Sequence, residues 1–258
     1  MDLELKGKTA LVTGSTAGIG LAIAAALARE GASVIVNGRT QARVDRAIAE
    51  SGAAHGVAAD LGTEMGARAV MERFPEVDIL VNNLGIFEPK PFEEIPDDDW
   101  RRFFEVNVLS GVRLSRHYIG PMRRKNWGRI VFISSESGLQ IPKEMIHYGV
   151  TKTAQIAVAR GLAETTAGTG ITVNSVLPGP TKSEGVVEFV ARLASANGVD
   201  AAAIEREFFT RARPSSLLKR FATTDEVATV VAFVCSPLAS AINGASVRAE
   251  GGVVQSIA

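Results

Sequence analysis

The sequence alternates short runs of apolar, often β-branched residues with longer segments that carry charges on one side. The short runs lack the polar alternation of a strand with one solvated face, so we interpret them as strands buried on both faces. They occupy residues 8–13, 33–37, 54–59, 77–83, 128–135 and 170–178. We expect helices near residues 18–30, 40–50, 63–73, 97–118 and 146–167. Such alternation, with right-handed crossovers, predicts an α/β fold with a single doubly wound parallel sheet and helices on both faces.

The composition narrows the partners that this chain can bind. The 28 Lys and Arg residues balance the 28 Asp and Glu residues, so the formal net charge is zero at pH 7. Such a chain has no basic field to attract a phosphate backbone or an anionic lipid surface, and we expect neither nucleic acid nor a membrane as a partner. With 258 residues and 46% hydrophobic side chains, residues 1–258 are expected to form one domain with a large core.

Cysteine and histidine are sparse. The single cysteine, Cys235, lies in the apolar run VATVVAFVC and is predicted to be a buried helix residue rather than a nucleophile. The histidines, His55, His117 and His147, lack the spacing of metal ligands, so no metal site is predicted. The apolar run 19–28 resembles part of a signal peptide, but it follows glycines instead of basic residues and is too short to span a bilayer. We therefore expect a cytoplasmic protein.

A glycine-rich turn, TGSTAGIG, connects the first predicted strand to the first predicted helix. Its glycines allow the backbone to turn sharply and to approach a ligand closely, and the helix N-terminus beyond presents unpaired N–H groups to a pyrophosphate. A tight connection without a ligand is the alternative, but the flanking strand and helix favour a dinucleotide site. No Lys-Ser or Lys-Thr pair follows, which excludes a P-loop. The predicted cofactor contacts in this turn are Gly14, Ser15, Thr16, Gly18, Ile19 and Gly20.

Further motifs follow in order along the chain, and with the glycine turn they resemble those of the short-chain dehydrogenase/reductase family, in its single-domain branch. The motifs are Asp60 after the third strand, NNLG at 82–85, Asn107, ISS at 133–135, Tyr148 with Lys152, PGPT at 178–181 and EGG at 250–252. Two departures are Leu84, where the family usually has alanine, and Glu250, where it usually has aspartate. The resemblance covers almost the whole chain and implies a Rossmann-type, NAD(P)-dependent oxidoreductase.

Tyr148 and Lys152 are four residues apart in a predicted helix, so their side chains leave the same face one turn apart. Taken alone, such a pair is more often a packing arrangement than a catalytic one. Free tyrosine titrates near pH 10, and a proton-transfer group works best near the operating pH. A desolvated ammonium beside the phenol, together with an oxidised nicotinamide ring, would lower the pKa of the tyrosine by about 2 to 3 pH units.

By resemblance, Ser135 and Asn107 complete the catalytic set with Tyr148 and Lys152. Ser135 ends the fifth strand thirteen residues before Tyr148, the separation at which the family's serine and tyrosine face each other, and its hydroxyl would hold the substrate carbonyl. Ser134 points to the other side of the strand because side chains alternate. Asn107 would hold a helix kink and a water that connects Lys152 to bulk solvent.

The resemblance implies hydride transfer between a nicotinamide cofactor and a small-molecule carbonyl or secondary alcohol, with Tyr148 as general acid and base. The further cofactor contacts that it implies are Asp60 and Leu61 at the adenine edge, Asn83 and Gly85 at the adenosine and ribose side, Pro178, Gly179 and Thr181 around the carboxamide, and Tyr148 with Lys152. A non-catalytic dinucleotide sensor is one alternative, although such a protein would have lost the reacting groups. An epimerase or dehydratase is another, but it would have a different glycine spacing and a larger C-terminal substrate domain.

The end of the second strand, VIVNGRT, bears on the choice of cofactor. NAD enzymes of this type place an acidic residue there to accept both ribose hydroxyls, but this chain has Gly38 followed by Arg39. A guanidinium suits the 2′-phosphate of NADP, which an acidic residue would repel. We therefore predict NADP over NAD, although Ala17 stands where many NADP enzymes carry a second basic residue. The alternative is that Arg39 is a solvated loop cation.

Residues 182–216 form the largest stretch outside the strand–helix alternation. A first helix is indicated by apolar residues at helical spacing, namely Val186, Phe189, Val190 and Leu193, and a second helix is expected near 200–212. Their position after PGPT predicts a lid over the nicotinamide, and together with IPKEM at 141–145 it predicts an apolar pocket. Two helices packed on the core are the alternative. Small ketones, 3-oxoacyl thioesters, sugars and steroids all stay open as substrates.

The predicted helices near 97–118 and 146–167 correspond to those that form a four-helix subunit contact in the resembling family. The C-terminal stretch VVQSIA is apolar enough to join a second interface. The resemblance thus implies a homotetramer with D2 symmetry, with a dimer as the alternative.

Overall fold

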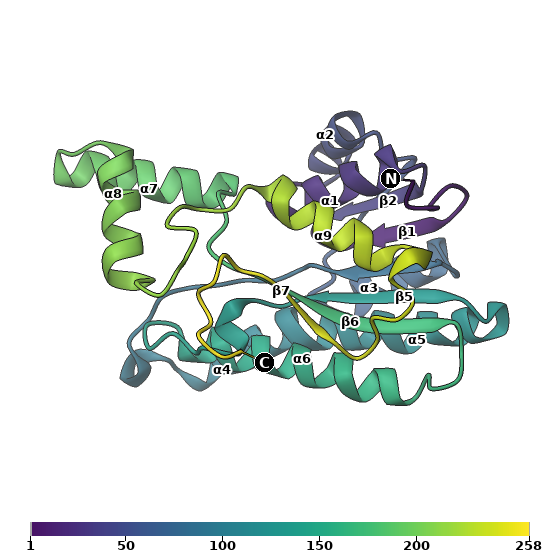
Figure 1. Ribbon diagram of the computed structural model, residues 1–258. Coiled ribbons are helices and arrows are strands. Elements are labelled where there is room, and N and C mark those ends of the chain that lie inside the picture. The colour runs from purple at the N-terminus through teal and green to yellow at the C-terminus, as the bar shows by residue number, and fades with distance from the viewer. Residues whose placement is uncertain (1, 258) are drawn as a thin grey trace.

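The computed structural model describes residues 2–257, apart from the side chains of Phe189 and Asn197. Within these residues, a seven-stranded sheet of parallel strands in the order β3-β2-β1-β4-β5-β6-β7 forms the centre of the molecule (Figure 1). The strands are β1 (Thr9–Val12), β2 (Ser33–Gly38), β3 (His55–Ala58), β4 (Ile79–Asn82), β5 (Gly128–Ile133), β6 (Ile171–Pro178) and β7 (Ser246–Ala249). The predicted doubly wound parallel sheet is confirmed.

Helices cover both faces of the sheet (Figure 1). One face carries α1 (Gly18–Arg29), α2 (Gln41–Ser51) and α9 (Thr224–Cys235). The other face carries α3 (Glu64–Arg73), α5 (Ser110–Lys125) and α6 (Ile146–Glu164), with α4 (Asp97–Phe104) packed against α6. Short 3-10 turns are η1 (Phe92–Glu94), η3 (Glu136–Gly138) and η5 (Pro237–Ala239). None of the helices within residues 2–257 is both long and apolar enough to cross a membrane.

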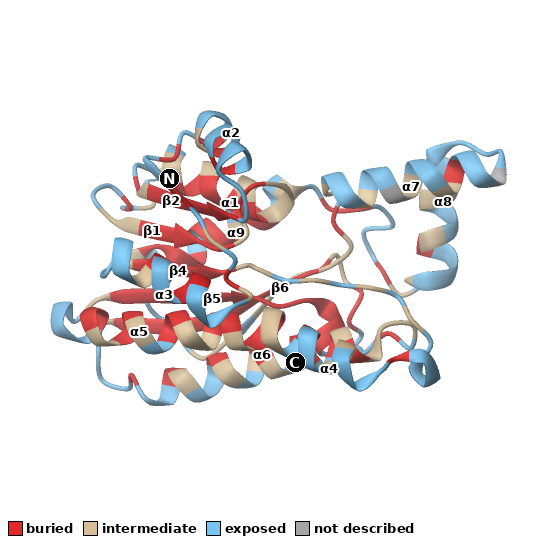
Figure 2. Ribbon diagram, turned by 180° about the vertical axis from the view of Figure 1, so that it is seen from behind, coloured by how far each residue is buried: buried red, intermediate tan, exposed pale blue. Residues whose placement is uncertain are grey.

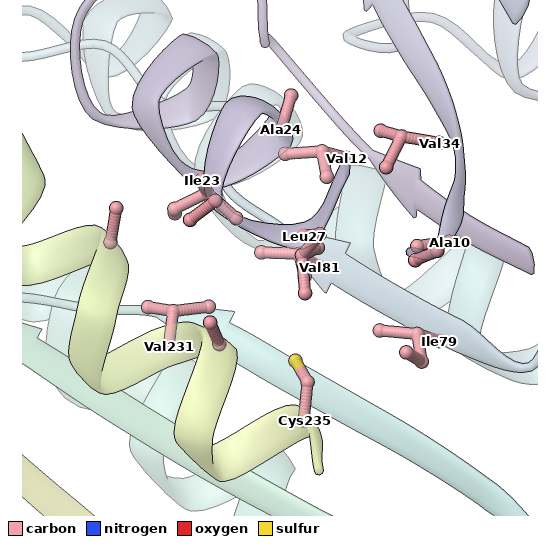
Figure 3. Packing of buried hydrophobic residues seen from close by; sticks show 14 of the residues in the cluster. Ala10, Val12, Ile23, Ala24, Leu27, Val34, Ile79, Val81, Val231 and Cys235 are labelled. Carbon is pink, nitrogen blue, oxygen red and sulfur yellow. The ribbon is translucent and has the colours of Figure 1, made fainter. Parts of the chain in front are cut away.

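Successive side chains of each strand point to opposite faces of the sheet and belong to two separate hydrophobic clusters. Leu11 of β1 lies in register with Ile35 of β2 and Leu80 of β4, and all three are fully buried on the face covered by α3, α5 and α6. Val12 points to the opposite face, where it packs in the cluster that includes Leu27 of α1 (Figure 3). Burial on both faces explains why the strands read as continuous apolar runs.

Cys235 ends α9 in the cluster that contains Val12 and Leu27, and no part of its side chain reaches solvent (Figure 3). Burial raises the pKa of its thiol to about 12. The reactive form of cysteine is the thiolate, so this residue is inert at neutral pH. The prediction of a buried helix residue is confirmed.

The structure corrects two details of the predicted elements. The helix expected over 97–118 consists of α4, a π-helical segment η2 (Glu105–Leu109) and α5, which continues to Lys125. Periodicity did not show this interruption, because one π-helical turn changes the apolar pattern little. The strand β7 was missed, since SVRA is only four residues long and lies partly exposed at the edge of the sheet.

We call residues 182–216 the outer segment. It contains α7 (Glu184–Asn197), α8 (Ala201–Glu207) and a second π-helical segment, η4 (Phe208–Ala212), close to the two helices expected there. Figures 1 and 2 show α7 and α8 extending away from the sheet, with most of their surface exposed. Phe189 of the expected apolar helix face lies outside the described side chains.

Candidate active site

The functional motifs meet at one edge of the sheet. The glycine turn follows β1, Asn83 follows β4, Ser135 follows β5 and Gly179 follows β6, all at the carboxyl ends of parallel strands. The chain winds outward in opposite directions from the neighbouring strands β1 and β4, so a topological switch point lies between them. Doubly wound sheets bind ligands at this place.

The glycine turn is shaped for close approach of a ligand. Gly14 and Gly18 have left-handed backbone conformations, with φ values of 58° and 56°. A Cβ atom on Gly20 would lie 2.4 Å from Asn83 Nδ2 and 2.6 Å from the Gly14 carbonyl oxygen, so no side chain fits there. The helix α1 begins without a side-chain cap, because the preceding residue is Ala17. Its first N–H groups are therefore free of side-chain partners, as a pyrophosphate site requires.

Polar side chains from neighbouring strands hold this turn. Asn83 Nδ2 donates to the carbonyl oxygens of Thr13 at 2.9 Å and of Gly14 at 3.0 Å. Asn37 Oδ1 accepts from the Gly14 amide at 3.2 Å. The Ser15 hydroxyl donates to the Val12 carbonyl at 2.7 Å and accepts from the Asn37 amide at 2.9 Å. Because the Ser15 hydroxyl is bonded within the protein, we expect only the backbone of Ser15 to contact the cofactor.

The residues expected at the adenine and ribose side surround the end of β2. A Cβ atom on Gly38 would lie 2.3 Å from Thr16 Cγ2, so the glycine lets the turn pack against the strand. Arg39 follows and is exposed. Asp60 is also exposed and accepts from the Gly62 amide at 3.0 Å. The Leu61 side chain is buried in the core, which leaves its backbone for a ligand.

The predicted catalytic pair lies on α6, beside the end of β5. Lys152 Nζ is 5.5 Å from the centre of the Tyr148 ring, and the Ser135 hydroxyl lies close enough to the phenol to lower its pKa. Ser134 turns the other way, and its hydroxyl donates to the Lys152 carbonyl at 2.8 Å. The structure therefore brings Ser135, Tyr148 and Lys152 together and gives Ser134 a structural bond.

The buried side chain of Gln155 connects Lys152 to Asn107 through hydrogen bonds. Lys152 Nζ donates to the Ile133 carbonyl at 2.9 Å and to Gln155 Oε1 at 3.1 Å. Gln155 Nε2 in turn donates to the Asn107 carbonyl at 2.6 Å. The side chain of Gln155 thus links the lysine to the backbone of Asn107. Sequence reasoning missed Gln155, although it lies one turn after Lys152 on the same helix face.

Asn107 occupies the π-helical segment η2, between α4 and α5. Its side chain is buried and fully bonded. Nδ2 donates to the Ile86 carbonyl at 3.0 Å and to Thr151 Oγ1 at 2.9 Å, and Oδ1 accepts from the Ile86 amide at 2.8 Å. These bonds hold the loop after β4 against α6.

The electrostatics of the pair differ from what the sequence suggested. Burial lowers the pKa of Lys152 to about 8. The pKa of Tyr148 is raised rather than lowered within the protein alone, first by burial and second by the nearby carboxylate of Glu136. Lys152 is not among the groups that lower this pKa, so the expected lowering does not arise from the lysine within the protein alone. The phenol is therefore fully protonated at neutral pH.

Two charged residues that sequence reasoning missed border this site. Glu136 follows Ser135 directly, and Arg213 follows the outer segment's η4. Arg213 Nε lies 3.1 Å from Glu136 Oε1, and both side chains are largely buried. The surroundings of Ser135 are thus more polar than the apolar pocket that the sequence predicted. No signal in the sequence pairs two residues so far apart.

The PGPT motif lies at the end of β6 as expected. A Cβ atom on Gly179 would lie 2.4 Å from the Glu250 carbonyl oxygen, so this position also requires glycine. Thr181 is buried, and its hydroxyl donates to the Gly179 carbonyl at 2.9 Å. Glu250, where the family usually has aspartate, is buried beneath them and accepts from the Val254 amide at 3.2 Å. The carboxylate therefore caps a turn.

Comparison with known proteins agrees with this geometry. The chain matches the family described as short chain dehydrogenase over residues 8–193. It is 50% identical to an uncharacterized oxidoreductase, YvaG, of Bacillus subtilis (strain 168), over 100% of both chains. It is 35% identical to the D-beta-hydroxybutyrate dehydrogenase of Cupriavidus necator, over 97% of this chain and 99% of that protein.

A solved structure extends the likeness to three dimensions. The crystal structure of L-sorbose reductase from Gluconobacter frateurii, complexed with NADPH and L-sorbose, matches with a TM-score of 0.93. That match covers 100% of both chains at 30% sequence identity. The matched family, the full-length relatives and the parallel sheet lead to one conclusion. The chain belongs to the short-chain dehydrogenase/reductase family of oxidoreductases.

Proposed function

We propose that this protein transfers hydride between NADP(H) and a carbonyl or secondary alcohol, with Tyr148 as general acid and base. The observation that carries the proposal is the convergence of Ser135, Tyr148 and Lys152 at the edge of the sheet where the glycine turn lies. The uncapped start of α1 and the left-handed backbone at Gly14 and Gly18 fit the pyrophosphate of a dinucleotide.

The side chains divide the chemistry between them. NADP(H), when bound, supplies the hydride. Ser135 holds the substrate oxygen, and Tyr148 donates its proton to the forming alkoxide. The raised pKa of Tyr148 keeps the phenol protonated for this step. Lys152, charged at neutral pH with a pKa of about 8, offsets the negative charge that develops on the phenol. In oxidation Tyr148 takes the proton back.

The preference for NADP rests on Arg39, which is exposed beside Gly38 and Thr16. A guanidinium at this place binds a 2′-phosphate, whereas NAD offers it nothing to bind. The variant Arg39→Ala should raise KM for NADPH by about tenfold or more and leave KM for NADH unchanged. Arg43→Ala, at another exposed arginine on α2, is the control. A wild-type KM for NAD ten times lower than that for NADP would refute the preference.

The substrate class is best addressed with a panel of carbonyl compounds. The relatives act, by their names, on D-β-hydroxybutyrate and L-sorbose, which differ in size and polarity. Ketoses, small ketones, 3-oxoacyl thioesters and steroids would be mixed with enzyme and NADPH while the absorbance of NADPH is followed. Turnover of at least one class is expected. Tight NADPH binding without turnover across the panel would favour a dinucleotide sensor instead.

A homotetramer is part of the same proposal. Apolar side chains are exposed on the helices that would meet in a four-helix contact, Phe104 on α4 and Val150 on α6, at 42% and 41% of their surface. Burying them against a symmetry-related copy would remove them from water. Light scattering at micromolar concentration should give the mass of four chains. A monomer mass would refute this assembly.

A further inference from the structure

A charged cluster lies where the outer segment meets the catalytic residues. It consists of Glu136, the first residue of η3, Glu144, before α6, and Arg213, after η4. The side chains of Glu136 and Arg213 are only 6% and 11% exposed. Charges so far removed from water are costly unless they are paired, and loss of one partner leaves the other uncompensated.

Arg213 binds the two carboxylates with different nitrogens. Its Nε lies 3.1 Å from Glu136 Oε1, and its Nη1 lies 3.1 Å from Glu144 Oε1. The Phe208 ring lies on one side of the guanidinium, 5.8 Å from its central carbon. Because Arg213 follows η4 directly, this one side chain ties the far end of the outer segment to the wall of the active site.

Glu136 reaches the reacting groups with its second oxygen. Its Oε2 accepts the hydrogen bond of the Ser135 hydroxyl, which is the group placed to hold the substrate oxygen. The charges that act on Tyr148 from other elements are Glu136, which raises the pKa of the phenol, and Arg213, which lowers it. Lys152 lies on the same helix as Tyr148 and is also affected by Glu136.

The two charges therefore have opposite effects on proton transfer. A carboxylate alone beside Ser135 would oppose the negative charge that develops on Tyr148. The guanidinium offsets it, but only while the end of the outer segment lies where the structure has it. The charge balance at the acid therefore depends on the position of the outer segment.

We propose that Arg213 is a positioning residue that acts through Glu136: it holds the outer segment at the active site and neutralises the carboxylate beside the Ser135–Tyr148 pair. The inference rests on the proposed function of Tyr148. It makes the placement of the outer segment a condition for efficient proton transfer, separately from any contact that the segment makes with a substrate.

The test is a charge-balance cycle with Arg213→Leu, Glu136→Gln and the double variant. Removing the cation should move the pH dependence of oxidation about one pH unit upward, and removing the anion should move it downward. The double variant should return close to the wild-type profile. Arg213→Leu should also lower kcat by about 10- to 100-fold, and the double variant should recover most of this loss. Arg213→Lys should be partly active.

A matched control is Arg211→Leu, at a neighbouring arginine of the same segment that is 80% exposed and pairs with Glu207. It should leave kcat and the pH dependence unchanged. If Arg213 served only to attach the outer segment, the double variant would also lack this attachment. Its kcat would then be as low as that of Arg213→Leu, instead of recovering. Such a result, or a normal Arg213→Leu enzyme, would overturn the proposal.

A second readout does not need turnover. The chain has two tyrosines, so in a Tyr118→Phe background a fluorinated tyrosine, whose phenol is more acidic, reports on Tyr148 alone by fluorine NMR. The pKa of this phenol should be higher in Arg213→Leu than in the wild type, and it should return to the wild-type value in the double variant. Unchanged titrations would refute the role of Arg213. If the titrations move as expected but no carbonyl is turned over, the proposed function fails while the charge coupling stands.

Discussion

The sheet with its covering helices differs from the outer segment in how much of its surface is buried. Strands β1, β4 and β5 are almost entirely buried, and the helices on each face add to one of two continuous hydrophobic clusters. In the outer segment α7 and α8 pack mainly against each other, and Figure 2 shows them largely exposed. Buried anchors in this segment include Phe209, whose ring packs against Phe208 and Phe221 at centroid distances of 5.1 Å.

This difference separates two requirements of one enzyme. The proposed cofactor site is formed by backbone that many core contacts hold in place. The outer segment is attached at separate points, such as Arg213 and the bond from the Ser215 hydroxyl to the Val253 carbonyl at 2.6 Å. Regions with few buried contacts open at low cost in free energy. We therefore expect the cofactor side of the site to be rigid and the substrate side to adjust.

The largest expected effect is that of Tyr148→Phe, which removes one oxygen from the rigid part. The rate constant kcat should fall by about 10² to 10⁴, the usual contribution of a general acid. The melting temperature and the affinity for NADPH should hardly move, because the ring still fills its place. Steady-state kinetics and calorimetry would be compared on the same preparation. A stable variant with more than a tenth of wild-type kcat would exclude Tyr148 as the acid.

The serines provide the control for this result. Ser135→Ala should lower kcat with the fold intact, since its hydroxyl faces the phenol. Ser134→Ala should instead cost about 1 kcal/mol of stability, because it removes a buried bond to the Lys152 carbonyl and nothing from the site. Equal losses of kcat in the two variants would count against the assigned role of Ser135.

Two phenylalanines compare the regions directly. Phe132→Ala, at a fully buried position of β5, should lower the free energy of unfolding by about 3 to 5 kcal/mol. Phe209→Ala should barely change global unfolding and should instead open the outer segment to proteases and to hydrogen exchange. Denaturant titration and limited proteolysis would measure the two effects. Equal losses of global stability would show that the outer segment folds as one unit with the sheet.

Replacing one glycine in each region by alanine compares how tightly the two regions are packed. Gly20→Ala should weaken NADPH binding by about tenfold or more and cost about 1 to 3 kcal/mol of stability, since the added carbon collides with Asn83 and Gly14. Gly185→Ala, in the first turn of α7, meets no atom within 4 Å and should stabilise that helix by about 0.5 to 1 kcal/mol. Calorimetric titration and melting curves distinguish the two. A neutral Gly20→Ala would argue against the close approach of a pyrophosphate.

A modest loss of kcat is expected for Gln155→Leu, which keeps the volume but removes the amide between Lys152 and Asn107. We expect kcat to fall by about tenfold. The lost acceptor favours the uncharged amine, so the pKa of Lys152 should drop below about 8 and reduction should lose activity at lower pH. The pH dependence of kcat/KM would show this shift. An alkaline limb that does not move would mean that Gln155 only fills space.

The sheet could be predicted from the sequence because burial on both faces leaves a local pattern in each strand. The proposed reacting groups could be named from motifs, since Tyr148 and Lys152 are four residues apart. Glu136 and Arg213 are 77 residues apart, and Gln155 and Asn107 are 48 apart. Their pairing depends on how the chain returns to the same edge of the sheet. Local patterns carry no information about such encounters.

The π-helical segment η2 also determines which way the side chains after it point around the helix axis. A residue added to a turn of α-helix rotates everything beyond it by about 100°. η2 therefore sets the direction of α5 separately from that of α4, so Asn107 can face α6 while Leu114 faces the sheet. Deleting one residue from Glu105–Leu109 would turn one of these faces away, whichever residue was removed. The number of residues in η2 thus matters to the site as much as their identity.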